Sequence, residues 1–140
     1  MKVLEKRTSQ AGFTLVELMV VALVVAILAA VTIPLMSGNR FRAMATEGEA
    51  ALGTIRVALR VNFSEADAYD IDTDGNTIST PLDLDALSVG DLEGRYFAEA
   101  DFVLSDLTAT TYTITGTGSG DALGIVVTLD QDGTYTRTFP

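Results

Sequence analysis

Three residue types are missing from this 140-residue chain, which contains no histidine, no cysteine and no tryptophan. Without histidine, the chain lacks the commonest general base and the commonest zinc ligand. Without cysteine, it forms no disulfide, carries no thiol nucleophile and binds no iron–sulfur cluster. These absences argue against most classes of enzyme and of metalloprotein.

Positive charge is also scarce, because 9 Lys and Arg residues stand against 19 Asp and Glu residues, for a net charge of −10. A protein that binds nucleic acid needs a basic surface to neutralise phosphates, so we expect no direct nucleic-acid partner. The chain is nevertheless 48% hydrophobic and only 20% charged. So high an apolar content in so acidic a chain indicates that the apolar residues are unevenly distributed.

The apolar residues are concentrated in one uncharged run from Leu18 to Asn39. As a helix, Leu18–Met36 would be about 28 Å long, which is close to the hydrocarbon thickness of a bilayer. The run is longer than the apolar part of a cleaved secretory signal, so a membrane span fits it better. Basic residues precede the run, and these favour a cytoplasmic start with residues from Arg40 onward on the outer side.

Glu17 places a carboxylate at the very start of this apolar run. Such a group is either solvated at the membrane interface or paired with a cation. A cut between Gly12 and Phe13 would create a positive amine at Phe13, one helical turn before Glu17. The pair could close within one chain or between neighbouring chains. Between chains it would set the helices in register, because an unpaired buried carboxylate is penalised.

The segment Gly12–Glu17, which reads GFTLVE, follows a short basic leader and precedes the apolar run. In this it resembles the class III leader of type IV pilins and of type II secretion pseudopilins, and Pro34 within the run fits the same pattern. The resemblance implies that a prepilin peptidase cuts after Gly12 and methylates the amine of Phe13. It also implies that Glu17 and Pro34 serve assembly, with Glu17 pairing with the Phe13 amine of an adjacent subunit.

The resemblance further implies a structural subunit with no catalytic activity. Residues 1–12 would be a cleaved basic leader, residues 13–39 the transmembrane and filament-core helix, and residues 40–140 a periplasmic or extracellular head. The precursor would cross the inner membrane once, surrounded by lipid, and would later join a filament. Its implied partners are copies of itself, other pilins or pseudopilins, the prepilin peptidase, and an inner-membrane platform protein with a cytoplasmic assembly ATPase.

Several functions stay open at this point. The main one is a type IV pilus used for adhesion, twitching motility or DNA uptake, and the alternative within the superfamily is a pseudopilus that drives protein export across the outer membrane. Outside the superfamily, the chain could be an uncut single-pass membrane protein with an exterior binding domain. It could also be a calcium-binding envelope module.

The remainder of the sequence predicts an α+β fold. Apolar residues at three- and four-residue steps extend the helix from about Phe13 to Ala66, with a kink or break at Pro34, which lacks an N–H and clashes with the preceding turn. Residues 67–94 are acidic and rich in turn formers, so we expect a loop there. Strand-like patterns follow at 95–97, 102–104, 110–115, 123–129 and 134–139, with a hairpin signal at Asp132-Gly133.

We expect three or four antiparallel strands, with one face packed on Leu52, Ile55 and Leu59 of the helix, which is the pilin fold. No cofactor is expected. The one calcium-like pattern places Asp70, Asp72 and Asp74 at alternate positions before a glycine, as at the start of a calcium loop. Pro81 stands where such a loop needs a bidentate glutamate, so these three residues are weak candidates and a solvated acidic loop is the simpler interpretation. The pattern at residues 130–133 is interpreted as a tight turn.

Overall fold

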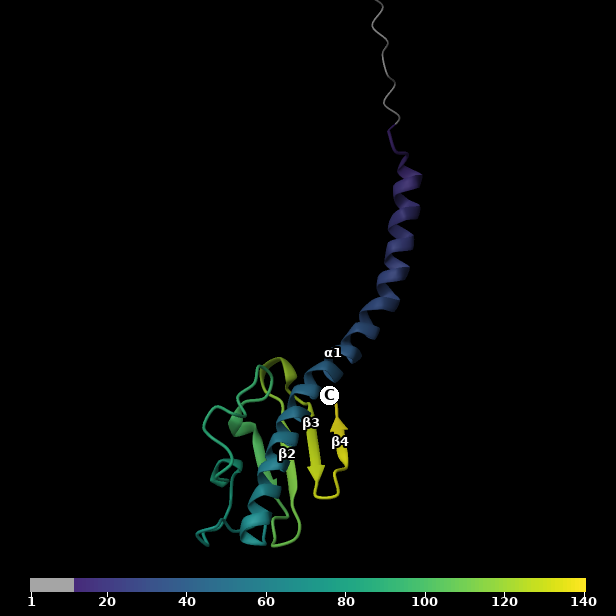
Figure 1. Cartoon of the computed structure of the whole chain (residues 1–140). Coiled ribbons are helices and arrows are strands. Elements are labelled where there is room, and N and C mark those ends of the chain that lie inside the picture. The colour runs from purple at the N-terminus through teal and green to yellow at the C-terminus, as the bar shows by residue number, and fades with distance from the viewer. Residues whose placement is uncertain (1–11) are drawn as a thin grey trace, which may run out of the picture. The chain divides into compact units, whose positions relative to one another are not determined.

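The computed structural model describes residues 12–140 (Figure 1). It contains one long helix, α1 (Leu15–Ala66), and four strands, β1 (Phe102–Ser105), β2 (Thr113–Thr117), β3 (Val126–Asp130) and β4 (Tyr135–Thr138). The chain divides into two compact units, Met1–Ser37 and Gly38–Pro140, of which the second is called the head below. A long apolar helix followed by an antiparallel sheet confirms the expected α+β fold.

The first part of α1 is apolar on every side. The segment Leu15–Thr32 has a mean hydropathy of 2.8, and none of it is buried within the structure. Of the described helices, it alone is long and apolar enough to cross a membrane. The helix is continuous through Pro34, so of the kink or break expected there, a break is not formed. A proline removes a single backbone donor, and the hydrogen bonds of the turns on either side are enough to continue the helix.

The head is a four-stranded antiparallel meander in the order β1-β2-β3-β4, packed against the second part of α1 (Figure 1). Alternate residues of the central strands face the helix, so that Ile114 pairs with Leu129 and both are fully buried. The helix residues expected in this interface, Leu52, Ile55 and Leu59, are also fully buried. This core explains why the pattern of apolar residues after Arg40 has a helical period.

The hairpin formed by β3 and β4 runs alongside α1. Arg40 of the helix forms an ion pair with Asp121, just before β3. Further along the helix, Glu49 pairs with Arg137 of β4, and Arg56 donates a hydrogen bond of 3.3 Å to the carbonyl of Gln131 in the hairpin turn. Contacts along the helix therefore follow the hairpin from its open end to its turn.

The strand expected at residues 95–97 is not formed. The strand predicted at 102–104 forms and is one residue longer, and the other three are shorter or displaced by a few residues. The carboxylate of Glu47 on α1 accepts hydrogen bonds from the backbone N–H groups of Tyr96, at 2.7 Å, and Phe97, at 3.1 Å. These donors would otherwise pair with a neighbouring strand. A side chain from the distant helix has thus replaced a sheet partner here.

Candidate functional site: the start of the long helix

The residues that precede α1 are organised by one threonine. The Thr14 hydroxyl accepts a hydrogen bond from the backbone N–H of Glu17, at 3.2 Å. In return, Glu17 Oε2 accepts hydrogen bonds from the backbone N–H and the hydroxyl of Thr14, both at 3.0 Å. This reciprocal arrangement is a capping box, which satisfies donors that the first turn of a helix leaves free. The site therefore holds its only carboxylate in a defined position.

Thr14 is the residue of this site that our sequence reasoning missed. The signal was present, because a threonine followed three residues later by a glutamate, just before an apolar run, is the sequence signature of a capping box. Glu17 was interpreted only as a charge at the start of an apolar run, so its role in a helix cap with Thr14 was not considered. The structure shows that the two residues act together, and that the helix dipole also favours a negative charge at this end.

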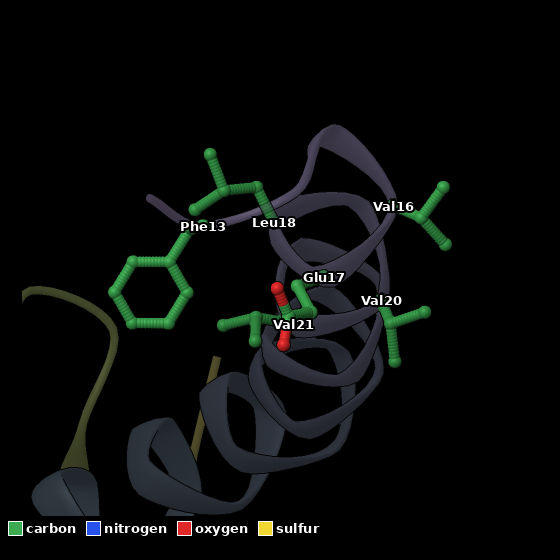
Figure 2. A pocket seen from close by; sticks show the side chains of 6 residues that line it. All are labelled: Phe13, Val16, Glu17, Leu18, Val20 and Val21. Carbon is green, nitrogen blue, oxygen red and sulfur yellow. The ribbon is translucent and has the colours of Figure 1, made fainter. Parts of the chain in front are cut away.

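Around Glu17 the surface is otherwise apolar. Figure 2 shows the Glu17 carboxylate between the ring of Phe13 on one side and the valines at 16 and 20 on the other. These side chains, with Leu18 and Val21, line a shallow open hollow on the side of the helix. A lone helix cannot enclose such a hollow, so it marks a surface that another molecule would cover.

The exposure of this surface is extreme for an apolar segment. Phe13 is 83% exposed, Leu15 80% and Met19 71%. Burial of one such side chain is worth about 1.5–3 kcal/mol, and this helix leaves a long series of them uncovered. Contiguous apolar patches of this kind mark protein–protein or membrane contacts. The helix is thus built to be surrounded by lipid or by other helices.

The sequence-predicted processing and assembly residues occupy different parts of this segment. Gly12 and Phe13 precede the helix in an exposed stretch without regular secondary structure, and a side chain added at Gly12 would meet none of the described residues within 4 Å. Pro34 lies within the helix, about 26 Å further along its axis than Glu17, so the two residues do not share a site. The basic residues of the predicted leader lie in residues 1–11, outside the described residues.

The acidic loop after the helix, which holds the weak calcium candidates, is organised by hydrogen bonds within the loop itself. Asp72 Oδ1 accepts hydrogen bonds from the backbone N–H groups of Asp74, at 2.9 Å, and Asn76, at 2.7 Å. The Asn76 side chain bonds Oδ2 at 2.8 Å, and these bonds from Asn76 lower the pKa of Asp72. Within residues 12–140, no three acidic side chains gather as metal ligands, so Asp70, Asp72 and Asp74 are not brought together.

The turn between β3 and β4 has the tight geometry that the sequence indicates. The backbone N–H of Gly133 donates to the carbonyl of Asp130 at 3.1 Å, and the Asp130 side chain accepts from the backbone N–H of Thr134 at 2.9 Å. Gly133 has a positive φ of 92°, which glycine adopts without strain. The prediction of a turn at residues 130–133 is therefore confirmed.

Two comparisons with known proteins give matches. Residues 7–33 match the family model for the prokaryotic N-terminal methylation motif. Over 93 residues, the chain is 30% identical to the type IV major fimbrial protein FimA of Dichelobacter nodosus and 29% identical to a fimbrial protein of the same organism. Each match covers 66% of this chain and 58% of the relative, so the chain spans less than two thirds of the relatives' length. No solved structure gives a significant match.

The comparisons and the structure point to the same family. The methylation motif overlaps the cap formed by Thr14 and Glu17 and the exposed apolar helix, and both relatives carry the name of a fimbrial protein rather than that of an enzyme. The architecture is the helix and antiparallel sheet expected of that family. The methylation motif, the fimbrial relatives and the architecture together support the type IV pilin superfamily.

Proposed function

We propose that this chain is the subunit of a type IV pilus-like filament, which is inserted in a membrane as a precursor and then assembled by packing of its apolar helices. The observation that carries this proposal is the fully exposed segment Leu15–Thr32 with one capped carboxylate at its start. The fimbrial names of the relatives favour a pilus over the pseudopilus of type II secretion. Adhesion, twitching motility and DNA uptake are the roles that such a pilus would serve.

The start of the helix fits processing between Gly12 and Phe13. The peptide bond lies in an exposed stretch without regular secondary structure, next to a residue without a side chain, so a membrane-embedded peptidase could reach it. Cleavage would leave a positive amine on Phe13, which the same enzyme would methylate. A platform protein with a cytoplasmic ATPase would then move the subunit from the inner membrane into the filament.

Glu17 would become the acceptor of that amine during assembly. Both hydrogen bonds from Thr14 end on Oε2, so among the described residues Oε1 is left for a donor from another subunit. A charge surrounded by apolar helices is costly unless it is paired. The amine of an adjacent subunit would supply that pairing, so only subunits in the correct register would be stable in the filament.

The first experiment is mass spectrometry of the N-terminal peptide, taken from membranes and from sheared surface material of a host with an active prepilin peptidase. We expect a peptide that begins at methylated Phe13. A Gly12→Val variant should remain uncut and stay entirely in the membrane. A wild-type peptide that begins at Met1, or normal filaments from the Gly12→Val variant, would refute the processing step.

A second experiment separates a filament subunit from an uncut membrane anchor. Glu17→Ala should leave the precursor in the membrane and abolish filaments, because the register-setting charge pair is lost. Glu65→Ala is the matched control, since it removes an exposed carboxylate from the other end of the same helix. Filament yield, measured by shearing and electron microscopy, should fall in the first variant only. Equal yields would support the uncut anchor instead.

A further inference from the structure

The head has an exposed apolar corner at the end where α1 enters it. Leu123 is 74% exposed, although most leucines of the head are buried, and Phe139 is 37% exposed. Pro140 lies beside them, with its Cβ only 3.1 Å from where a side chain at Gly124 would begin. We call Leu123, Phe139 and Pro140 the entry corner.

The exposure of Leu123 is built into a rigid turn. The preceding residue, Ala122, is fully buried and its carbonyl accepts the backbone N–H of Ile125 at 3.0 Å. Gly124 follows with a φ of +89°, a conformation that reverses the chain immediately after Leu123. Since Ala122 is directed into the core and Gly124 ends the turn, the side chain of Leu123 is left outside.

An ion pair fixes this corner to the first turn of α1 within the head. Arg40 Nη2 lies 2.9 Å from Asp121 Oδ2, two residues before Leu123. Phe139 directly follows β4 and lies two residues after Arg137, which contacts α1 through Glu49. The entry corner therefore lies close to Arg40.

Chain length limits how far Arg40 can be from the membrane. The apolar run continues to Met36, and the residues from there to Arg40 are all helical, which corresponds to about 6 Å. The headgroup layer on one side of a bilayer is about 5–8 Å thick. Whatever the angle between the two units, Arg40 is thus tethered at or just beyond the headgroups.

The charge near this end also suits a phospholipid surface. The head contains six arginines and no lysine, and two of the six, Arg40 and Arg42, lie in its first five residues. Both side chains are exposed. Arg40 neutralises Asp121, and Arg42 adds a positive charge in an otherwise strongly acidic domain. Apolar side chains beside basic ones are typical of surfaces that bind in the headgroup region.

We propose that the entry corner docks on the outer headgroup layer of the membrane that holds the span, with Leu123 and Phe139 entering the boundary between headgroups and acyl chains. This inference rests on the proposed function, because it requires the apolar helix to be inserted in that membrane. The contact holds the head of the waiting precursor against the bilayer, and it is released when the subunit leaves the lipid.

The test uses the uncut full-length chain in vesicles of phosphatidylethanolamine and phosphatidylglycerol whose acyl chains carry bromine near the headgroups. Because the chain has no tryptophan, each single-tryptophan variant gives one clean emission signal. Leu123→Trp reports on the entry corner. Val57→Trp is the matched control, since Val57 is 62% exposed and lies about 25 Å further along the helix than Arg40. Leu23→Trp, at a position 61% exposed within the span, reports insertion when the bromine is placed deeper in the acyl chains.

We expect bromine to remove about half of the Leu123→Trp fluorescence and very little of the Val57→Trp fluorescence, given an insertion depth of about 5–10 Å. Quenching of Leu23→Trp without quenching of Leu123→Trp would overturn the docking proposal and leave the proposed function intact. If Leu23→Trp also escapes quenching, membrane insertion itself fails, and the docking proposal fails with it. If the Leu123→Trp side chain is shielded in assembled filaments but not in the vesicles, lipid docking is likewise overturned, in favour of a contact between subunits.

A spin label provides a second measurement that does not depend on the folding of the Leu123→Trp variant. The chain has no cysteine, so Leu123→Cys provides a unique site for a spin label whose collisions with oxygen and with a water-soluble nickel chelate report depth. A label at the headgroup boundary should be shielded from the nickel reagent relative to one at Val57→Cys. Equal accessibility at the two positions would contradict the proposal.

Discussion

Gly48 is the point where α1 comes closest to the sheet. A Cβ added at this position would lie 2.8 Å from Phe97 Cζ and 2.9 Å from Val127 Cγ2, closer than side-chain carbons normally approach. Phe97 is 1% exposed and Val127 is fully buried, so neither side chain can move aside into solvent. We therefore predict that Gly48→Ala destabilises the head, although alanine is the better helix former.

The size of the effect follows from two opposing contributions. Replacement of a helical glycine by alanine stabilises a helix by about 1 kcal/mol. Overpacking of a well-packed core costs about 1–3 kcal/mol, and here the clash involves two immobile neighbours. The net result should be a loss of about 1 kcal/mol in the free energy of unfolding for Gly48→Ala.

Gly53, on the same helix, provides the matched control. A Cβ added there would have the Tyr135 hydroxyl as its nearest neighbour, at 3.6 Å, which is an ordinary contact. Gly53→Ala should therefore stabilise the head by about 0.5–1 kcal/mol. The two alanine variants of one helix should differ by about 2 kcal/mol, with opposite signs relative to the wild type.

The assay is urea unfolding of the full chain in detergent micelles, followed by the near-ultraviolet circular dichroism of tyrosine. All four tyrosines lie in the head, so this signal reports its unfolding and not that of the span. If Gly48→Ala proves as stable as Gly53→Ala, the close approach of helix and sheet at Gly48 is wrong.

Three further predictions concern the head. The pKa of Asp83 lies below its ordinary value of 3.8 because backbone N–H groups bond its carboxylate, so its stabilising effect is fully present above pH 3.8 and is lost as the pH falls through the lower folded value. Asp83→Ala should thus lower the urea midpoint at pH 7. The difference in midpoint between the variant and the wild type should become smaller as the pH falls below 3.8. Arg137→Lys should speed amide hydrogen exchange in β4, because lysine cannot make the two-pronged contact with Glu49; unchanged exchange would show that the contact does not hold the strand. Among residues 12–140 the buried Tyr112 hydroxyl makes no hydrogen bond of standard geometry, although the Arg56 side chain lies near it, so Tyr112→Phe should change stability by less than about 0.5 kcal/mol, and a large loss would show that Arg56 bonds it.

The elements that local pattern determines were predictable from the sequence. The helix ends at Ala66 as expected, because its apolar period stops there and acidic turn residues follow. The β3–β4 hairpin was predictable from β-branched residues on either side of Asp132-Gly133. The cap at Thr14 was equally local, and the capping-box signature could have identified it.

Features that depend on distant residues could not be predicted in this way. Tyr96 and Phe97 have the composition of a strand, but Glu47, which precedes them by about fifty residues, takes their backbone donors. No periodicity within 95–97 contains that information. The acidic loop could not be predicted for a different reason. Aspartates at alternate positions are compatible both with a metal-binding loop and with a turn whose side chains accept hydrogen bonds from the same loop. The bond from the Asn76 side chain to Asp72 is a feature of the turn that the pattern of aspartates alone does not predict.

The apolar side chains of α1 are buried within the head but exposed in the segment before it. This difference has a consequence for how a filament could form. The core of the head takes its helix residues from Met44 onward, all of them buried by the sheet and loops. The segment Leu15–Thr32 is buried by nothing in the chain. In the proposed assembly, transfer of this segment from lipid to other helices would therefore leave the head core intact. Lipid is about as apolar as leucine, so that transfer gains little from the hydrophobic effect. The selectivity of the step must then come from packing and from the pairing of Glu17, which is why Glu17→Ala should prevent assembly without unfolding the head.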